Sequence, residues 1–257
     1  MSRFGNLEFD REFDREFREA ESPQSESHFL AGARQAFENG EFEKALRWFA
    51  KVLEFNPQNA AAWTGQVRAL IELGEFREAT LWASKALEQF PREPELLAAK
   101  AVALGRAGER EEALAYSDAS IEERGDTPYI WLARGDVLLA RAESRADYCF
   151  DKALALAPGD WVTAWLAARI RFFYRQFAVA LKLLQQAIEL NTTHFLLWMQ
   201  LGQCQLALGL AGPAARSFQQ ARELNPQCDA ARLGSSQAAS AGVGSRLRGF
   251  WRRLFHS

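Results

Sequence analysis

A bulky side chain returns at intervals of 34 or 33 residues along most of this 257-residue chain. A small side chain keeps the same interval, and a residue that interrupts helices follows it in most units. A fixed interval of this length is the signature of an array in which each repeat packs only on its neighbours. The sequence therefore predicts six repeats rather than one compact domain. The three recurring positions are Phe29, Trp63, Leu97, Trp131, Trp165 and Trp198; Ala45, Ala79, Ala113, Ala146, Ala180 and Ala214; and Pro57, Pro91, Gly125, Pro158, Thr192 and Pro226.

Each repeat has the pattern of two helices, which is clearest in residues 60–93. Trp63, Val67 and Leu70 form one apolar stripe, and Gly74 follows where a first helix must end, because glycine accepts the left-handed conformation. Pro91 ends the second helix, since proline lacks an amide donor. Two helices approach closely only where side chains are small. The predicted close-contact positions on the first helices are Ala33, Val67, Ala101, Gly135 and Gly202.

Residues 39–59, NGEFEKALRWFAKVLEFNPQN, resemble the second-helix pattern of tetratricopeptide repeats (TPRs), and the resemblance extends over about 200 residues. It implies an all-α fold, a right-handed superhelical array of antiparallel helix pairs (an α-solenoid). The resemblance also implies a non-catalytic scaffold or adaptor that binds a peptide or helix of a partner protein in its concave groove. The alternatives are an organiser at a membrane surface and an assembly or chaperone-like factor. The expected repeats are residues 26–59, 60–93, 94–127, 128–160, 161–194 and 195–228.

Two repeats depart from the pattern. Repeat four is one residue short, with 142–144 in place of a glycine-centred turn. Repeat five has Arg175 at the glycine position and Thr192 at the proline position. Its first helix also fits two registers: Trp165 and Phe172 suit one, and Ala168 suits a register one residue earlier. The sequence leaves this register open.

In TPR proteins the second, fifth, ninth and twelfth positions of each first helix line the groove, and the resemblance transfers these positions to this chain. The resulting surface is mixed near Arg34 and Arg68 and mainly apolar in repeats four and six. The two arginines are expected to orient an acidic segment. The alternative is that the register is shifted by one and these side chains are inter-repeat core. The predicted groove residues are Arg34, Phe37, Arg68, Tyr129, Leu132, Asp136, Leu139, Leu196, Met199, Gln203 and Leu206.

The two ends of the chain have patterns of their own. Residues 1–25 form an acidic leader with Phe9, Phe13 and Phe17 on one helical face, which is either frayed or docks on the first repeat or a partner. Residues 229–233 are predicted as a short cap and 234–245 as a flexible linker, because the linker is rich in Gly, Ala and Ser.

Residues 246–257 are predicted to form a basic amphipathic helix. Arginines flank an aromatic stripe, a pattern typical of interfacial membrane helices and of groove-binding peptides. This helix could bind an anionic membrane, a groove of the same or a neighbouring copy of the chain, or the acidic leader. A disordered tail is the remaining alternative. Of these alternatives, the sequence favours binding to an anionic membrane. The tail residues are Leu247, Phe250, Trp251, Arg252, Arg253, Leu254 and Phe255.

Composition narrows the function further. The formal net charge is −2, so a nucleic-acid partner is not expected. The 3 cysteines are scattered without a CxxC pair, which favours a reducing, cytoplasmic compartment, with peripheral membrane attachment as the alternative. No motif for catalysis, cofactor binding or metal binding is present. We therefore expect no enzyme activity and no cofactor, and a protein or peptide as partner, with self-association as a further option.

Overall fold

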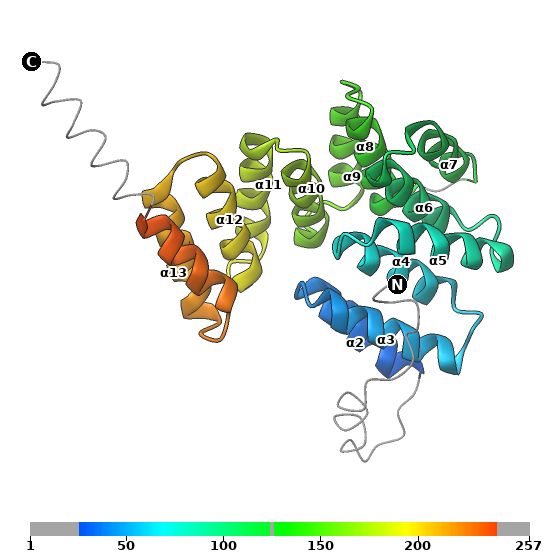
Figure 1. Cartoon of the computed structure of the whole chain (residues 1–257), viewed down its shortest axis with the longest axis horizontal. Coiled ribbons are helices and arrows are strands. Elements are labelled where there is room, and N and C mark those ends of the chain that lie inside the picture. Colours follow the sequence, from blue (N-terminus) through cyan, green and yellow to red (C-terminus); the bar gives the residue numbers. More distant parts are fainter. Residues whose placement is uncertain (1–25, 124–125, 241–257) are drawn as a thin grey trace, which may run out of the picture. The chain divides into compact units, whose positions relative to one another are not determined.

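The computed structural model describes residues 26–123 and 126–240, and helices joined by short turns make up these ranges (Figure 1). Successive helices form pairs, so the predicted all-α array of stacked helix pairs is confirmed. The chain divides into two compact parts, an N-terminal part (residues 1–156) and a C-terminal part (residues 157–257). The pairs are α2 (Glu26–Glu38) with α3 (Phe42–Phe55), α4 (Ala60–Glu72) with α5 (Phe76–Gln89), α6 (Pro94–Ala107) with α7 (Arg110–Glu122), α8 (Pro128–Ala140) with α9 (Ala146–Leu156), α10 (Trp161–Phe173) with α11 (Phe177–Leu190), and α12 (Phe195–Ala207) with α13 (Ala211–Leu224).

The small residues lie where the helices approach each other. In the N-terminal part Ala45, Ala79 and Ala113 are fully buried on the second helices. The Phe49 ring of α3 lies against Gly65 of α4, where an added Cβ would collide with it. This contact joins one repeat to the next, because a large ring fills the space that the missing side chain leaves.

The turns between paired helices keep their shape without glycine. Gly74 and Gly209 have positive φ angles at this turn, and Ala142 (φ 58°) and Arg175 (φ 60°) adopt the same conformation in repeats four and five. A residue with a Cβ adopts it at a cost of about 1–2 kcal/mol. The tertiary packing of the helix pairs therefore imposes the turn even where the sequence lacks its usual residue.

The structure also settles the register of repeat five. Helix α10 begins at Trp161, which places the buried Ala168 at the close-contact position. Trp165 thus lies one position beyond Trp63 and Trp198, and its contacts differ. The indole N–H groups of Trp63 and Trp198 donate to backbone oxygens of the preceding turn. That of Trp165 donates to Oε1 of Gln200 in α12, at 2.9 Å, with both side chains buried. Trp165 therefore does not belong with the recurring bulky residues.

Residues 229–240 are helical, so the helix continues past the predicted end of the cap at residue 233 into the predicted linker. We call residues 229–240 the cap helix. Gly234 lies against the Phe218 ring of α13, and Ala238 joins the core cluster around Ala214 and Phe218. The small residues that suggest a linker by composition let this helix approach α13 closely.

Residues 241–257 lie outside the described ranges, as do residues 1–25. Within the described ranges no helix combines the length and the hydropathy that crossing a bilayer requires.

Candidate partner-binding surface

Arg68 occupies the middle of the predicted groove in the N-terminal part. Its Cζ atom lies 3.9 Å from the ring centre of Tyr129 in α8 and 5.1 Å from that of Phe37 in α2. The guanidinium of α4 is thus held by aromatic rings from two other first helices. The structure brings together three of the residues that the sequence predicts for one surface.

Arg68 is partly exposed, and within the described ranges its guanidinium forms no hydrogen bond or ion pair. Arg34, exposed on α2, is likewise without such a partner in the described part of the chain. Other arginines of the N-terminal part are engaged: Arg134 pairs with Asp118 at 2.7 Å, and Arg141 pairs with Glu111 at 2.6 Å. The donors of Arg34 and Arg68 are therefore available to a ligand.

Tyr129 contributes an uncharged ring to this surface. Burial raises the pKa of its phenol, and the nearby Arg68 charge opposes that rise. The carboxylates of Glu95, Asp136 and Glu72 raise the pKa further. The phenol is therefore neutral at physiological pH, and Tyr129 acts as a stacking partner.

The sequence places Asp136 in the groove, but its carboxylate is engaged inside the array. Nε and Nη2 of Arg106 donate to its Oδ2 at 3.0 and 2.7 Å, and the two side chains are 5% and 1% exposed for Arg106 and Asp136 respectively. The pair joins α6 to α8. A buried ion pair of this kind holds neighbouring helices in register and leaves little of the carboxylate for a partner. We therefore leave Asp136 out of the binding surface.

The predicted apolar groove residues are mostly covered. Phe37 and Leu132 in the N-terminal part and Leu196 and Met199 in the C-terminal part are buried. Leu206 packs against the Ala214–Phe218–Ala238 cluster. Gln203 is exposed and Leu139 is partly exposed. The exposed large apolar side chains of the N-terminal part lie on second helices instead, at Phe55, Leu81, Tyr148 and Leu156.

Two carboxylates near the arginine are absent from the predicted groove. Glu72 lies four residues after Arg68 on α4, a spacing that places both on one helical face. Glu95 on α6 accepts a hydrogen bond from Thr127 Oγ1 at 2.8 Å. The four-residue spacing could have indicated Glu72, whereas Glu95 required the tertiary structure.

Two of the predicted features, the C-terminal tail and the N-terminal leader, belong to parts of the chain that the structure does not describe. The tail residues from Leu247 to Phe255 and the phenylalanines of the leader lie outside the described residues. Among the residues that are described, no group of three or more His, Cys, Asp or Glu side chains is placed to hold a metal ion.

Comparison with known proteins agrees with this architecture. A tetratricopeptide repeat family model matches residues 36–101, and no curated protein matches the chain. A tetratricopeptide repeat protein from Parabacteroides merdae is similar in structure, with a TM-score of 0.53 and 16% identity, over 88% of this chain and 89% of that one.

Two larger structures share the fold. The human IFIT1 dimer with m7Gppp-AAAA has a TM-score of 0.51 and 20% identity, over 95% of this chain and 62% of that one. A chain of the APC/C hetero-tetramer Cut9–Hcn1 has a TM-score of 0.52 and 18% identity, over 85% of this chain and 44% of that one. This chain thus spans less than half of the latter. The family match and the helix pair repeated from α2 to α13 together identify the chain as a tetratricopeptide repeat protein.

Proposed function

We propose that this chain is a non-catalytic interaction scaffold, and that the first-helix face of its N-terminal part binds an acidic segment of a partner protein. One observation carries the proposal: the Arg68 guanidinium lies against the rings of Tyr129 and Phe37, with no carboxylate partner among the described residues. TPR proteins typically mediate contacts between proteins, which agrees with this assignment.

The stacked arrangement suits the recognition of a carboxylate. A guanidinium is planar, and its N–H groups match the two oxygens of a carboxylate. The two neighbouring rings restrict the rotation of this guanidinium, so less conformational entropy is lost when the ligand binds. Cation–π contact contributes about 0.5–2 kcal/mol toward holding the group in place. Arg68 is therefore arranged as a rigid anchor.

The surrounding charges indicate the side from which the carboxylate approaches. Glu72 and Glu95 lie near Tyr129 and would repel a second negative group there. Arg34 lies three residues before Phe37 on α2, so the two side chains share one side of that helix. We propose that the acidic group binds between Arg34 and Arg68, on the Phe37 side.

We expect Arg68→Gln to weaken the binding of acidic peptides at least about ten-fold, a loss of roughly 1.4 kcal/mol. The test uses fluorescence anisotropy with the full-length chain and a set of peptides in which the number and position of Asp and Glu vary. Arg77→Gln is the matched control, because Arg77 is exposed on the second helix of the same repeat. Equal affinities for the two variants, with unchanged circular dichroism, would remove Arg68 from the binding surface.

A further inference from the structure

Arg34 and Arg68 occupy the same position of repeats one and two, on the first helices α2 and α4. These two helices contact each other, and equivalent residues of neighbouring repeats lie on the same face of an array. Neither guanidinium forms a hydrogen bond or ion pair within the described ranges. Two sets of donors for acidic groups therefore lie on one face of the N-terminal part.

The row of positive charges ends after these two arginines. The same position holds Val102 in repeat three and Asp136 in repeat four. Val102 is 4% exposed, and Asp136 is paired with Arg106. Helix α6 also carries the Glu95 carboxylate, which lies near Tyr129. The face therefore changes from basic on α2 and α4 to neutral and acidic on α6 and α8. It offers places for two acidic groups and disfavours a longer acidic run.

The packing of α2 on α4 sets the distance between the two acidic groups. Neighbouring helices have axes about 8–10 Å apart, and the flexible arginine side chains can approach each other over part of this distance. In an extended segment, alternate side chains point to the same side and are about 6.6 Å apart, whereas consecutive side chains point to opposite sides. Two acidic residues separated by a single residue therefore match the two arginines.

The rings beside Arg68 favour an extended segment over a helix. The Cζ atom of Arg68 lies 3.9 Å from the ring centre of Tyr129 and 5.1 Å from that of Phe37. The two ring centres are therefore no farther apart than the sum of these distances, about 9 Å. An α-helix with its side chains is about 10–12 Å wide and does not fit between them. An extended chain is narrower, since neighbouring strands of a sheet lie about 4.8 Å apart.

We infer that this surface selects an extended segment with an Asp or Glu at two positions separated by one residue, and that Arg34 binds one carboxylate and Arg68 the other. Beyond Arg68 the segment continues toward α6 without a further acidic group, because Glu95 would repel it. Arg34 is thus the residue that sets the required spacing. The inference rests on the proposed function, because it specifies the chemistry of the segment that the same surface binds.

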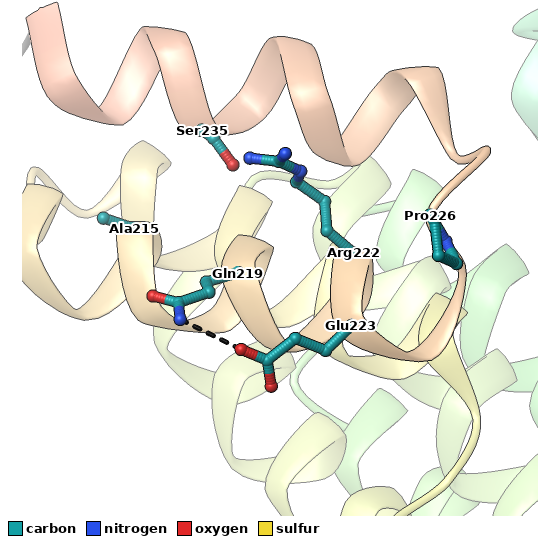
Figure 2. Close-up of a pocket in the computed structure, with 6 residues that line it drawn as sticks. All are labelled: Ala215, Gln219, Arg222, Glu223, Pro226 and Ser235. Atoms are coloured by element: carbon teal, nitrogen blue, oxygen red, sulfur yellow. Dashed lines mark hydrogen bonds between the residues drawn. The ribbon is translucent and has the colours of Figure 1, made fainter.

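Arg222 provides a comparison within the same chain. It is exposed on α13 and, like Arg34, forms no hydrogen bond or ion pair with the described residues. It lines a pocket of about 480 Å³ between α13 and the cap helix. Figure 2 shows Glu223 on the same lining, where its Oε1 accepts a hydrogen bond from Gln219 at 2.9 Å. The lining has no aromatic ring and no second arginine. Arg222→Gln therefore controls for unspecific attraction of acidic peptides.

Peptides that carry two Glu residues in an otherwise neutral sequence test the inference. The separation of the two residues runs from one to five positions along the chain, so every peptide of the series has the same net charge. Fluorescence anisotropy with the full-length protein at one salt concentration gives the dissociation constants. We expect the peptide with Glu at i and i+2 to bind at least about ten-fold more tightly than those with Glu at i and i+1 or at i and i+4.

Substitution of each arginine assigns this preference to its cause. Arg34→Gln should reduce the preference for the i, i+2 peptide to less than about two-fold, because only the Arg68 site remains. A peptide with a single Glu should bind Arg34→Gln and the wild type with similar affinity. Arg222→Gln should change neither the affinities nor the preference.

Four results would overturn the inference. Equal affinities for all separations, together with weaker binding by Arg68→Gln, would remove the pair of acidic residues but keep the proposed function. A preference for the i, i+4 peptide would assign the segment to a helix. Equal losses in Arg34→Gln and Arg222→Gln would show unspecific attraction. Unchanged binding of every peptide by Arg68→Gln would remove the proposed function itself, and the inference with it.

Discussion

Asp136→Ala is expected to lower the free energy of unfolding of the N-terminal part by about 3–5 kcal/mol, because it leaves the buried Arg106 charge without its partner. The Arg106 side chain is 5% exposed, so water cannot replace the carboxylate without opening the contact between α6 and α8. Urea denaturation followed by circular dichroism measures the loss. The fit must allow for separate transitions, since long arrays do not always unfold in one step.

Two further variants show whether the loss of stability in Asp136→Ala comes from the buried ion pair. Glu111→Ala removes a carboxylate that is 87% exposed from its pair with Arg141, and exposed pairs contribute about 0–1 kcal/mol. The double substitution Arg106→Met with Asp136→Leu removes both charges and should restore most of the stability. Similar denaturation midpoints for Asp136→Ala and Glu111→Ala would show that the Asp136 carboxylate is accessible, as the groove hypothesis requires.

Phe218→Ala is expected to cost about 3–5 kcal/mol, the usual range for a buried aromatic residue. Phe218 is 1% exposed, and its ring lies against both Gly202 of α12 and Gly234 of the cap helix. Its removal leaves a cavity that no side chain at either glycine fills. The cap helix should therefore lose its protection from hydrogen exchange along with global stability.

Leu233→Ala is the matched control for this effect, because it shortens an apolar side chain of the cap helix that is 60% exposed. We expect it to change the stability by less than about 0.5 kcal/mol. Gly234→Ala should destabilise the cap helix from the opposite side of the contact, since an added Cβ meets the Phe218 ring. Unchanged exchange of residues 229–240 in Phe218→Ala would contradict the packing of the cap helix on α13.

The fold follows from the sequence because the repeat interval, the small residues and the helix ends all indicate the same unit. The repeat interval alone gave the wrong assignment for Trp165. This residue keeps the spacing of the recurring bulky residues, but its indole N–H donates a hydrogen bond to Gln200 in the next repeat. Ala168 at the close-contact position was the better guide, because backbone approach tolerates less variation than the position of a large ring. Composition was a poor guide at residues 234–240, which were predicted as a linker, because small residues permit close helix packing as readily as they permit a linker.

The binding surface was harder to predict than the fold. Positions along a helix indicate which side chains share a face, but they do not indicate how closely neighbouring first helices approach. Alanines at 98, 99 and 103 are buried on α6. An added Cβ at Gly105 would lie 3.7 Å from Cβ of Ala140 in α8. This close approach accompanies the burial of Asp136 and Leu132, whereas Arg68 reaches across to Tyr129 and stays accessible.

The proposed role of Arg68 depends on its planar, stacked guanidinium as well as on its positive charge. Arg68→Lys separates the two contributions, because lysine keeps the charge but loses the planar set of donors. The direct measurement is the dissociation constant of the tightest acidic peptide for the full-length wild-type, Arg68→Lys and Arg68→Gln proteins at one salt concentration. We predict that Arg68→Lys loses at least about ten-fold in affinity and resembles Arg68→Gln. Wild-type affinity in Arg68→Lys would show that charge alone attracts the peptide, and would contradict the stacked anchor.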